Sequence, residues 1–350
     1  MSSFDRSSYK IEKKKKKRRI VFTWIILPIM VLSLSAAAYG SFLFNKAESV
    51  MDKSYIPVER ELKREPVNPI DENTSVLFIG VDDSELRNFN SSSRSDALML
   101  ATFNEKEKSV KLLSIPRDSY VYIPEAGYND KITHAHAIGG VASTIETVEG
   151  MLDIPIDYYV KMNFNAFTAV IDALDGVKVN VPYALQEMDS SDHQGAITLQ
   201  PGLQTLNGEE ALALARTRKQ DNDIERGKRQ QEIIKAIISK ATSAKGVTKY
   251  SDVLEAIGEN MTTDLSFSNM KAFIDYATSG LNLEVETLTI AGADAYIDGI
   301  YYYQLDETSL EEIKTKISSH LELEDSIITE SNEENDDESV GNLSNAVSEN

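Results

Sequence analysis

The chain of 350 residues contains no cysteine. This absence excludes disulfide bonds, a thiolate nucleophile and a zinc-thiolate site, so a hydrophobic core must hold the fold together. Basic charge is also scarce, because 36 Lys and Arg face 56 Asp and Glu, for a net charge of −20. We expect no nucleic-acid partner for such an acidic chain.

Several catalytic signatures are absent as well. The sequence shows no Walker loop, no Gly-rich dinucleotide fingerprint and no Ser-His-Asp arrangement. Of the four histidines, His134 and His136 have a spacing that can bind metal on a strand. The residues around them favour a helix start, where positions i and i+2 diverge. We therefore expect no histidine-based centre.

A run without charged residues, 20–44, follows seven consecutive basic residues at 13–19. Its length suits a bilayer core, and the positive-inside rule places the N-terminus in the cytosol and the rest outside. The alanines at 36–38 resemble a cleavage site, so a cleaved signal peptide is the alternative. The apolar run continues past these alanines, which favours an uncleaved single-pass anchor in the cytoplasmic membrane. An exported, disulfide-free protein of this kind suits a Gram-positive envelope.

Composition divides the chain into five parts. We expect a cytosolic basic tail at 1–19, a transmembrane anchor at 20–44, a polar stalk at 45–73, an extracellular domain at 74–320 and a disordered acidic tail at 321–350. Residues 1–19 carry nine basic and two acidic side chains, +7, so the remainder carries −27. The exported part is therefore strongly acidic.

The extracellular part alternates strand and helix patterns. Continuous apolar runs at 75–81, 97–103 and 110–115 predict three neighbouring buried strands. Further strands are predicted at 158–162, 177–181 and 284–290, and helices at 140–152, 165–174, 209–215, 225–242, 267–279 and 309–320. This interleaving predicts an α/β fold with α/β/α layers around a central mixed sheet.

Residues 215–230 carry six cationic side chains, so the local net charge is positive in a chain that is negative overall. A turn is predicted at 221–223, and a helical pattern starts at Ile224. Arg226 and Gln230 lie on the helix stripe that becomes apolar further along. Helix N-terminal amides and guanidinium groups favour phosphate, which predicts a ligand with a phosphate head and an apolar tail. The alternative is a solvated basic helix start with an ordinary core face behind it.

Two carboxylates, Asp82 and Asp96, lie where the first predicted strand ends and the second begins. If the strands are antiparallel neighbours, these groups meet at one sheet edge and suit Mg²⁺, which takes few carboxylates and completes its shell with water and phosphate oxygens. Alternatively, both residues cap turns.

Arginines are predicted to gather around these acids. Arg94 precedes Asp96, and Arg117 leaves the third strand at a proline break. The cationic run adds Arg216, Arg218 and Arg226. Five arginines around two acids favour a diphosphate bridged by Mg²⁺, whereas the alternative is a surface lattice of salt bridges, which contributes little to stability.

These residues fall in motifs that are spread along the chain in a fixed order. The motifs are SVLFIGVD (75–82), RSD (94–96), LSIPRD (113–118), DKITHA (130–135) and LNGEEAL (206–212), the last leading into RTR (216–218) and RGKRQ (226–230). Over about residues 74–242 the chain resembles the LytR-CpsA-Psr (LCP) family. In the DKITHA motif, Thr133 occupies a position where the resemblance leads us to expect asparagine. We therefore expect the hydrogen bonding around the site to differ in this detail from that of the family.

The resemblance implies an α/β/α fold whose groove holds a polyprenyl-linked pyrophosphate. It implies a phosphotransferase that moves an anionic glycopolymer, of teichoic acid or capsule type, from this carrier to peptidoglycan. It also implies roles for individual residues: Mg²⁺ at Asp82 and Asp96, a pyrophosphate clamp of Arg94, Arg117, Arg216 and Arg218, and a pocket completed by Asp223, Arg226 and Gln230.

We expect catalytic roles for Arg94, Arg117, Arg218 and Asp223, the last as a candidate general base. The lipid groove is predicted to be lined by apolar residues, each of which would otherwise belong to the core. These are Ile145, Val148, Phe167, Val170, Ile233, Ile234 and Ile237.

Three other functions stay open on the sequence alone. A membrane-bound regulator or attenuator is one, although nineteen cytosolic residues are too few for a DNA-binding domain. A pyrophosphatase would use water in place of the sugar hydroxyl in the same site. A non-catalytic protein that binds polyprenyl phosphate is the third.

Overall fold

The computed structural model describes residues 41, 42, 45, 48, 49, 52–59, 67–69, 71–82, 93–191, 193–220, 222–243, 249–279 and 283–323. The predicted anchor at 20–44 and acidic tail at 321–350 lie almost wholly outside the described residues. No helix among the described residues is both long enough and apolar enough to cross a membrane. The chain divides into two compact units, 1–50 and 51–350, and the fold described below is that of the second.

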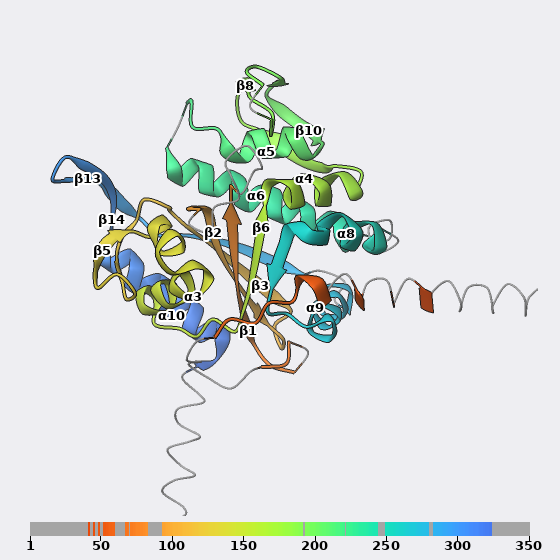
Figure 1. The fold of residues 1–350 in the computed structure, drawn as a ribbon, viewed down its shortest axis with the longest axis horizontal. Coiled ribbons are helices and arrows are strands. Elements are labelled where there is room, and N and C mark those ends of the chain that lie inside the picture. The colour runs from red at the N-terminus through yellow and green to blue at the C-terminus, as the bar shows by residue number, and fades with distance from the viewer. Residues whose placement is uncertain are drawn as a thin grey trace, which may run out of the picture. The chain divides into compact units, whose positions relative to one another are not determined.

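A six-stranded mixed sheet forms the centre of the body (Figure 1). Its strands follow the order β11, β6, β1, β2, β3, β12 and span Met261–Thr263, Tyr158–Asn163, Thr74–Val81, Ser95–Asn104, Ser109–Ile115 and Glu284–Thr289. β2 is antiparallel to both of its neighbours, β1 and β3. β6 runs parallel to β1, and β12 runs parallel to β3. The prediction that the first three apolar runs are neighbouring central strands is confirmed.

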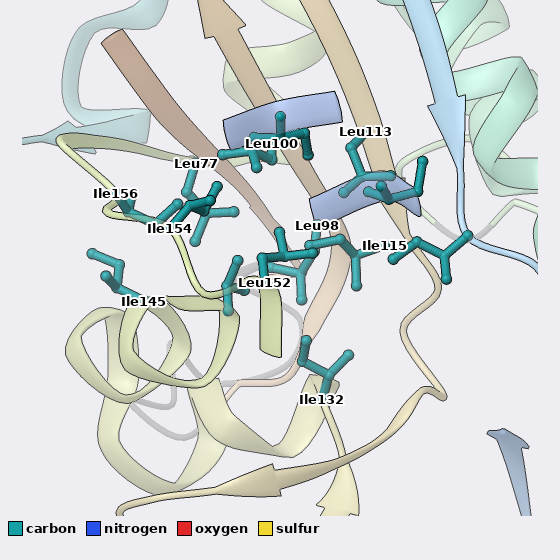
Figure 2. Close-up of a cluster of buried hydrophobic side chains, with 14 of the residues drawn as sticks. Leu77, Leu98, Leu100, Leu113, Ile115, Ile132, Ile145, Leu152, Ile154 and Ile156 are labelled. Atoms are coloured by element: carbon teal, nitrogen blue, oxygen red, sulfur yellow. The ribbon is translucent and has the colours of Figure 1, made fainter. Parts of the chain in front are cut away.

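Helices cover both faces of this sheet because its strands are apolar on both sides. Leu77, Leu100 and Leu113 pack with Ile145 of α3 (Thr133–Leu152) and with Ile317 of α10 (Glu307–Leu321). Figure 2 shows this cluster between the sheet and α3.

The other face of the sheet carries Phe78, Met99 and Leu112. These pack with Ile234 of α6 (Asp223–Ala241) and Tyr276 of α9 (Phe267–Ser279). The predicted mixed α/β fold with helices on either side of a central sheet is therefore confirmed.

A group of smaller elements packs on α6 and on α4 (Phe164–Ala173). It comprises β7 (Val177–Val181), β8 (Leu185–Glu187), β9 (Ile197–Leu199), β10 (Gly202–Leu206), α5 (Gly208–Arg216), α8 (Tyr250–Ile257) and the 3₁₀ turn η3 (Gly258–Asn260). Asn207 starts α5 with a capping box, in which its side chain accepts from the Glu210 N–H. The strand predicted at 177–181 exists but pairs with β10 outside the central sheet.

Two hairpins complete the body: β4 (Tyr120–Ile123) with β5 (Tyr128–Lys131), and β13 (Gly292–Ile297) with β14 (Ile300–Leu305). They touch through the rings of Tyr120 and Tyr302, whose centroids are 4.9 Å apart. Neither hairpin was predicted from the sequence.

Part of the predicted stalk is packed on the body, which corrects the boundary at residue 74. The Ile56 N–H donates to Thr263 O, and its carbonyl accepts from the hydroxyl of Tyr159. Val67 is buried, and its carbonyl accepts from Tyr158. At the other end, Leu321, which we assigned to the acidic tail, is buried in the core as the last residue of α10.

Candidate anion-binding site

Three strand ends meet at one edge of the central sheet. Because β2 is antiparallel to both neighbours, the end of β1 at Val81 and the end of β3 at Ile115 lie beside the start of β2 at Ser95. Asp82 follows β1, and Pro116 and Arg117 follow β3. The register shifts at this edge, since Gly80 pairs with Ala97 and Val81 pairs with Ser95. Asp96 is thus the extra residue of a β-bulge, a feature that re-aims side chains next to functional sites.

Arg117 joins the third strand end to this bulge. Its Nη1 donates to Asp96 Oδ1 at 2.7 Å, and its Nε lies 3.6 Å from Asp118 Oδ2. Asp118 is buried and also pairs with Lys131, with 2.8 Å between Nζ and Oδ1. Burial alone would raise the pKa of Asp118. Hydrogen bonds with Lys131 and Asp223 and the charges of Arg117 and Lys131 outweigh burial and hold this pKa below its usual value.

The first turn of α6 forms the opposite wall of the site. Asn222 caps the helix by accepting from the Glu225 N–H at 3.0 Å, which fixes Asp223 and Arg226 in that turn. Asp223 Oδ1 lies 3.2 Å from Arg218 Nε and 3.5 Å from Arg226 Nη1. Arg226 Nη2 donates to the backbone oxygen of Asp96 at 3.3 Å, so the helix and the bulge are in direct contact.

Arg226 is only 6% exposed. Burial lowers its pKa to about 10; the charges of Asp223 and Asp96 partly offset burial, and those of Arg218 and Arg117 add to it. The three guanidinium groups therefore converge on one small volume, as the sequence predicted.

Some guanidinium N–H groups in this volume have no hydrogen-bond acceptor among the described residues. Within the described part of the chain, Arg117 Nε and Arg226 Nε are buried and make no hydrogen bond. Buried donors without acceptors cost free energy, which an anion can recover with its oxygens. The geometry is thus that of an anion site suited to phosphate.

Two further arginines predicted for the site do not join this network among the described residues. Arg94 is exposed and directly precedes β2. Arg216 lies over the ring of Phe164, with its guanidinium carbon 5.2 Å from the centroid. The exposed Lys219 and Lys228 pair with Glu187 and Glu225 outside it.

Gln230 and Arg229 connect α6 to the end of α5. Gln230 Nε2 donates to Ala215 O at 3.2 Å, so the amide that we predicted to bind pyrophosphate supports the backbone of the arginine segment. Arg229 is 7% exposed and donates to Leu214 O at 3.1 Å and Thr217 O at 2.5 Å. The sequence analysis assigned no role to Arg229, because its place in the cationic run does not reveal which way the side chain points.

Two side chains of α3 support the same edge. The Thr133 hydroxyl donates to Ser95 O at 2.6 Å, and His136 Nδ1 bonds Ser93 O at 2.6 Å. His134 pairs with Asp130 at 2.7 Å. As predicted, a helix starts here, and the two histidines bond different partners, Asp130 and the backbone of Ser93.

The chemistry of two carboxylates near this edge suits a divalent cation. Asp82 directly follows β1, Asp96 lies in the antiparallel neighbour β2, and Mg²⁺ needs only one or two carboxylates besides water and phosphate oxygens. Within the described ranges, no three or more His, Cys, Asp or Glu side chains come together as a group that could hold a metal ion.

The structure corrects part of the predicted lipid groove. Ile145 and Val148 are fully buried between α3 and the sheet, on the face opposite α6, and Ile233 is fully buried beside β7. These three residues are core. The other four are partly buried and lie on α4 and α6: Phe167, Val170, Ile234 and Ile237.

The sequence model of the LytR_cpsA_psr family matches residues 41–319 of the chain. The chain belongs to this family. It is 40% identical over 318 residues to the polyisoprenyl-teichoic acid–peptidoglycan teichoic acid transferase TagT of Bacillus subtilis, which covers 88% of this chain and 98% of TagT.

Solved structures of TagT have the same fold as this LytR_cpsA_psr protein. The structure of TagT bound to LIIa-WTA is 42% identical, with a TM-score of 0.63. The structure of YwtF (TagT) with bound octaprenyl pyrophosphate lipid is 40% identical, with a TM-score of 0.60. Both alignments cover 77% of this chain and 98% of the solved chain.

Proposed function

We propose that the protein is a transferase that moves an anionic glycopolymer of the teichoic acid class from a polyprenyl pyrophosphate carrier to peptidoglycan. One observation carries the proposal: the guanidinium groups of Arg117, Arg218 and Arg226 converge, and the buried Nε atoms of Arg117 and Arg226 make no hydrogen bond among the described residues. The relatives named as teichoic acid transferases and the TagT structure with bound octaprenyl pyrophosphate support it.

In this proposal a sugar hydroxyl of the acceptor attacks the phosphorus on the glycan side of the diphosphate. A new oxygen–phosphorus bond forms, the bond to the bridging oxygen breaks, and polyprenyl phosphate leaves. Catalysis is mostly positioning and charge neutralisation. Arg117, Arg218 and Arg226 hold the diphosphate oxygens, with Arg94 and Arg216 completing the clamp from the rim. Asp223 takes the proton of the attacking hydroxyl.

The proposal includes Mg²⁺ held by Asp82 and Asp96. When bound, the ion neutralises negative charge on the diphosphate oxygens. The ion pair of Arg117 with Asp96 orients that carboxylate toward the same space. Phe167, Val170, Ile234 and Ile237 are proposed to contact the polyprenyl chain.

The proposed location is the outer face of a Gram-positive cytoplasmic membrane. The basic residues 1–19 would stay in the cytosol, residues 20–44 would span the bilayer once, and the catalytic body would be extracellular. The charge pattern of the N-terminal segment supports this topology.

Reconstitution with the full-length protein in detergent tests the function. Lipid-linked teichoic acid, Mg²⁺ and peptidoglycan are incubated with the wild type, Arg117→Ala, Arg218→Ala and the control Lys228→Ala. We expect each of the two pocket variants to lose roughly 100-fold or more in rate, as when one donor to a transition-state oxyanion is removed. Lys228→Ala should transfer normally, because Lys228 is exposed and pairs only with Glu225 among the described residues.

The same assay separates the alternatives. Release of free phosphorylated polymer with water as acceptor would identify a pyrophosphatase. Tight lipid binding without turnover would identify a carrier. Undiminished transfer by both pocket variants would refute the site.

A further inference from the structure

The β13–β14 hairpin projects from the body as an arm (Figure 1). Its sequence contains Tyr296, Tyr301, Tyr302 and Tyr303. Asp298 and Gly299 form its two-residue turn, both with the positive φ that such turns require. Tyr296 near the tip is 74% exposed and Ile300 is 51% exposed. The two side chains belong to neighbouring cross-strand pairs and so lie on opposite faces of the arm.

Two tyrosines of the arm form a fixed pair on one face. Tyr296 and Tyr301 are directly opposite across the strands, with ring centroids 5.7 Å apart at an angle of 66°. The Tyr301 hydroxyl donates to Asp294 at 2.9 Å. Ile297 and Ile300 also form a cross-strand pair, and the alternation of a strand places them on the opposite face.

The tyrosine pair is linked to the anion site by one side chain. Lys131 Nζ lies 5.5 Å from the centroid of the Tyr301 ring and 2.8 Å from Asp118 Oδ1. Asp118 is in turn the neighbour of Arg117. Burial, the bond to Asp294 and the charges of Asp223 and Asp118 together raise the pKa of Tyr301, in keeping with its position close to both carboxylates.

The charge of the arm restricts what it can bind. Residues 292–305 contain Asp294 and Asp298 and no lysine or arginine. These carboxylates disfavour an anionic polymer or an anionic lipid headgroup on the arm, and the neighbouring charge of Lys131 is paired with Asp118. A tyrosine ring offers an apolar face to the C–H face of a sugar ring, and its hydroxyl and the nearby carboxylates can bond sugar hydroxyls. Rigid tyrosines provide this contact at low entropic cost.

We propose that the face of the β13–β14 arm carrying Tyr296 and Tyr301 binds the acceptor glycan, a chain of uncharged N-acetylated sugars, and guides one of its hydroxyls toward the Arg117 side of the site. The identity of the acceptor rests on the transferase function proposed above. In this proposal the arm binds the acceptor, whereas the anion site of Arg117, Arg218 and Arg226 binds the lipid diphosphate.

Two binding measurements on the full-length protein test the arm. The first titrates a soluble tetramer of β-1,4-linked N-acetylglucosamine, and the second titrates octaprenyl pyrophosphate. Tyr296→Ala and Tyr301→Ala should raise the Kd for the tetramer at least tenfold and leave the Kd for octaprenyl pyrophosphate within twofold. Tyr296→Phe keeps the ring and should bind the tetramer within threefold of the wild type. Ile300→Ala, on the other face, should bind both ligands normally.

Transfer kinetics give a further readout: Tyr296→Ala should raise the KM for the glycan acceptor with little change in kcat.

Normal tetramer binding by Tyr296→Ala would overturn the proposal, and so would a loss of tetramer affinity in Ile300→Ala equal to that in Tyr296→Ala. So would a wild-type dimer that Tyr296→Ala converts to a monomer with glycan binding intact, because the arm would then join two copies. Tetramer binding that depends on Tyr296 in a protein with no affinity for octaprenyl pyrophosphate would leave the glycan surface standing and refute the transferase.

Discussion

Arg226 and Arg229 lie three residues apart on α6 and are equally buried, but they make different contacts. Arg229 gives hydrogen bonds to two backbone carbonyls, whereas Arg226 meets one carbonyl at 3.3 Å and keeps its Nε without an acceptor among the described residues. A buried side chain that serves the fold has its hydrogen bonds satisfied. The incomplete bonding of Arg226 therefore indicates a role in binding.

We expect Arg226→Met to change the free energy of unfolding by less than about 1 kcal/mol, since it removes a buried charge and leaves Asp223 paired with Arg218. Its affinity for octaprenyl pyrophosphate should fall roughly 10-fold or more, the loss of about one charge-assisted hydrogen bond. Chemical denaturation and lipid titration measure the two effects.

The matched variant is Arg229→Met, which leaves the carbonyls of Leu214 and Thr217 buried without their donor. It should lose about 2–3 kcal/mol of stability. Equal destabilisation by both variants would show that Arg226 is structural as well.

His320 makes the stability of the core depend on pH. The side chain is 3% exposed, with Nδ1 at 2.8 Å from the Thr102 hydroxyl and Nε2 at 2.8 Å from that of Ser109. Burial, followed by the charge of Lys111, lowers its pKa to about 4 from an ordinary value of 6.5, against the opposing charges of Glu107 and Glu286.

Because the folded pKa is below the unfolded one, the unfolded chain binds the proton more strongly, and stability falls as the pH drops from 6.5 toward 4. The loss attributable to His320 should reach about 3 kcal/mol. Urea unfolding at pH 7.5 and at pH 4.5 measures it. His320→Asn, which does not titrate here, should show a smaller loss between the two pH values. An identical loss in both proteins would assign the pH dependence to carboxylates instead.

Among the helices and strands, the sequence predicted the positions of strands that have a local apolar pattern. Beyond the first three strands, it did not predict which strands pair with one another. Continuous apolar runs located β1, β2 and β3 within two residues at each end. β7 was located as a strand, but its partner β10 is set by long-range packing. The β13–β14 hairpin was missed although Asp298–Gly299 is a hairpin signal, because the exposed tyrosines beside it do not form the apolar pattern of a buried strand.

Helix α3 begins seven residues before the predicted start because a short helical segment is joined to it across a break. Gly139 and Gly140 have non-helical dihedral angles, and Gly140 adopts φ 65° and ψ −144°, a conformation that is essentially restricted to glycine. The break lets Thr133 and His136 reach the start of β2.

Gly140→Ala should lower the free energy of unfolding by about 1–3 kcal/mol through backbone strain. Gly150→Ala in the same helix is the control. It has helical geometry with open space around its Cα, and alanine there should stabilise by about 0.5–1 kcal/mol. Thermal unfolding of the two variants compares them. A stabilised Gly140→Ala would mean that the break is not needed.

For the whole molecule, the sequence predicted that the ends of the central strands form the site and that arginines converge there. It did not predict all the residues that surround these arginines. The prediction that Asp96, Arg117, Arg218 and Arg226 lie close together was possible because the sequence pattern indicates where strands end and where a helix starts. The same periodicity placed Ile145 in the lipid groove, since a helical repeat identifies an apolar stripe without saying which side of the sheet it covers. The pairing of Lys131 with Asp118 depends on the β4–β5 hairpin and had no local signal.

The absence of cysteine makes the proposed membrane topology directly measurable, because one introduced thiol is the only thiol in the chain. Ser191→Cys lies in an exposed loop of the body, and Ser2→Cys lies in the basic N-terminal segment. With seven consecutive basic residues before the apolar run, we expect a maleimide that cannot cross membranes to label Ser191→Cys on intact cells and Ser2→Cys only after the membrane is opened. A mature protein that lacks the Ser2→Cys thiol even then would indicate signal-peptide cleavage, and labelling of both variants on intact cells would contradict a cytosolic N-terminus.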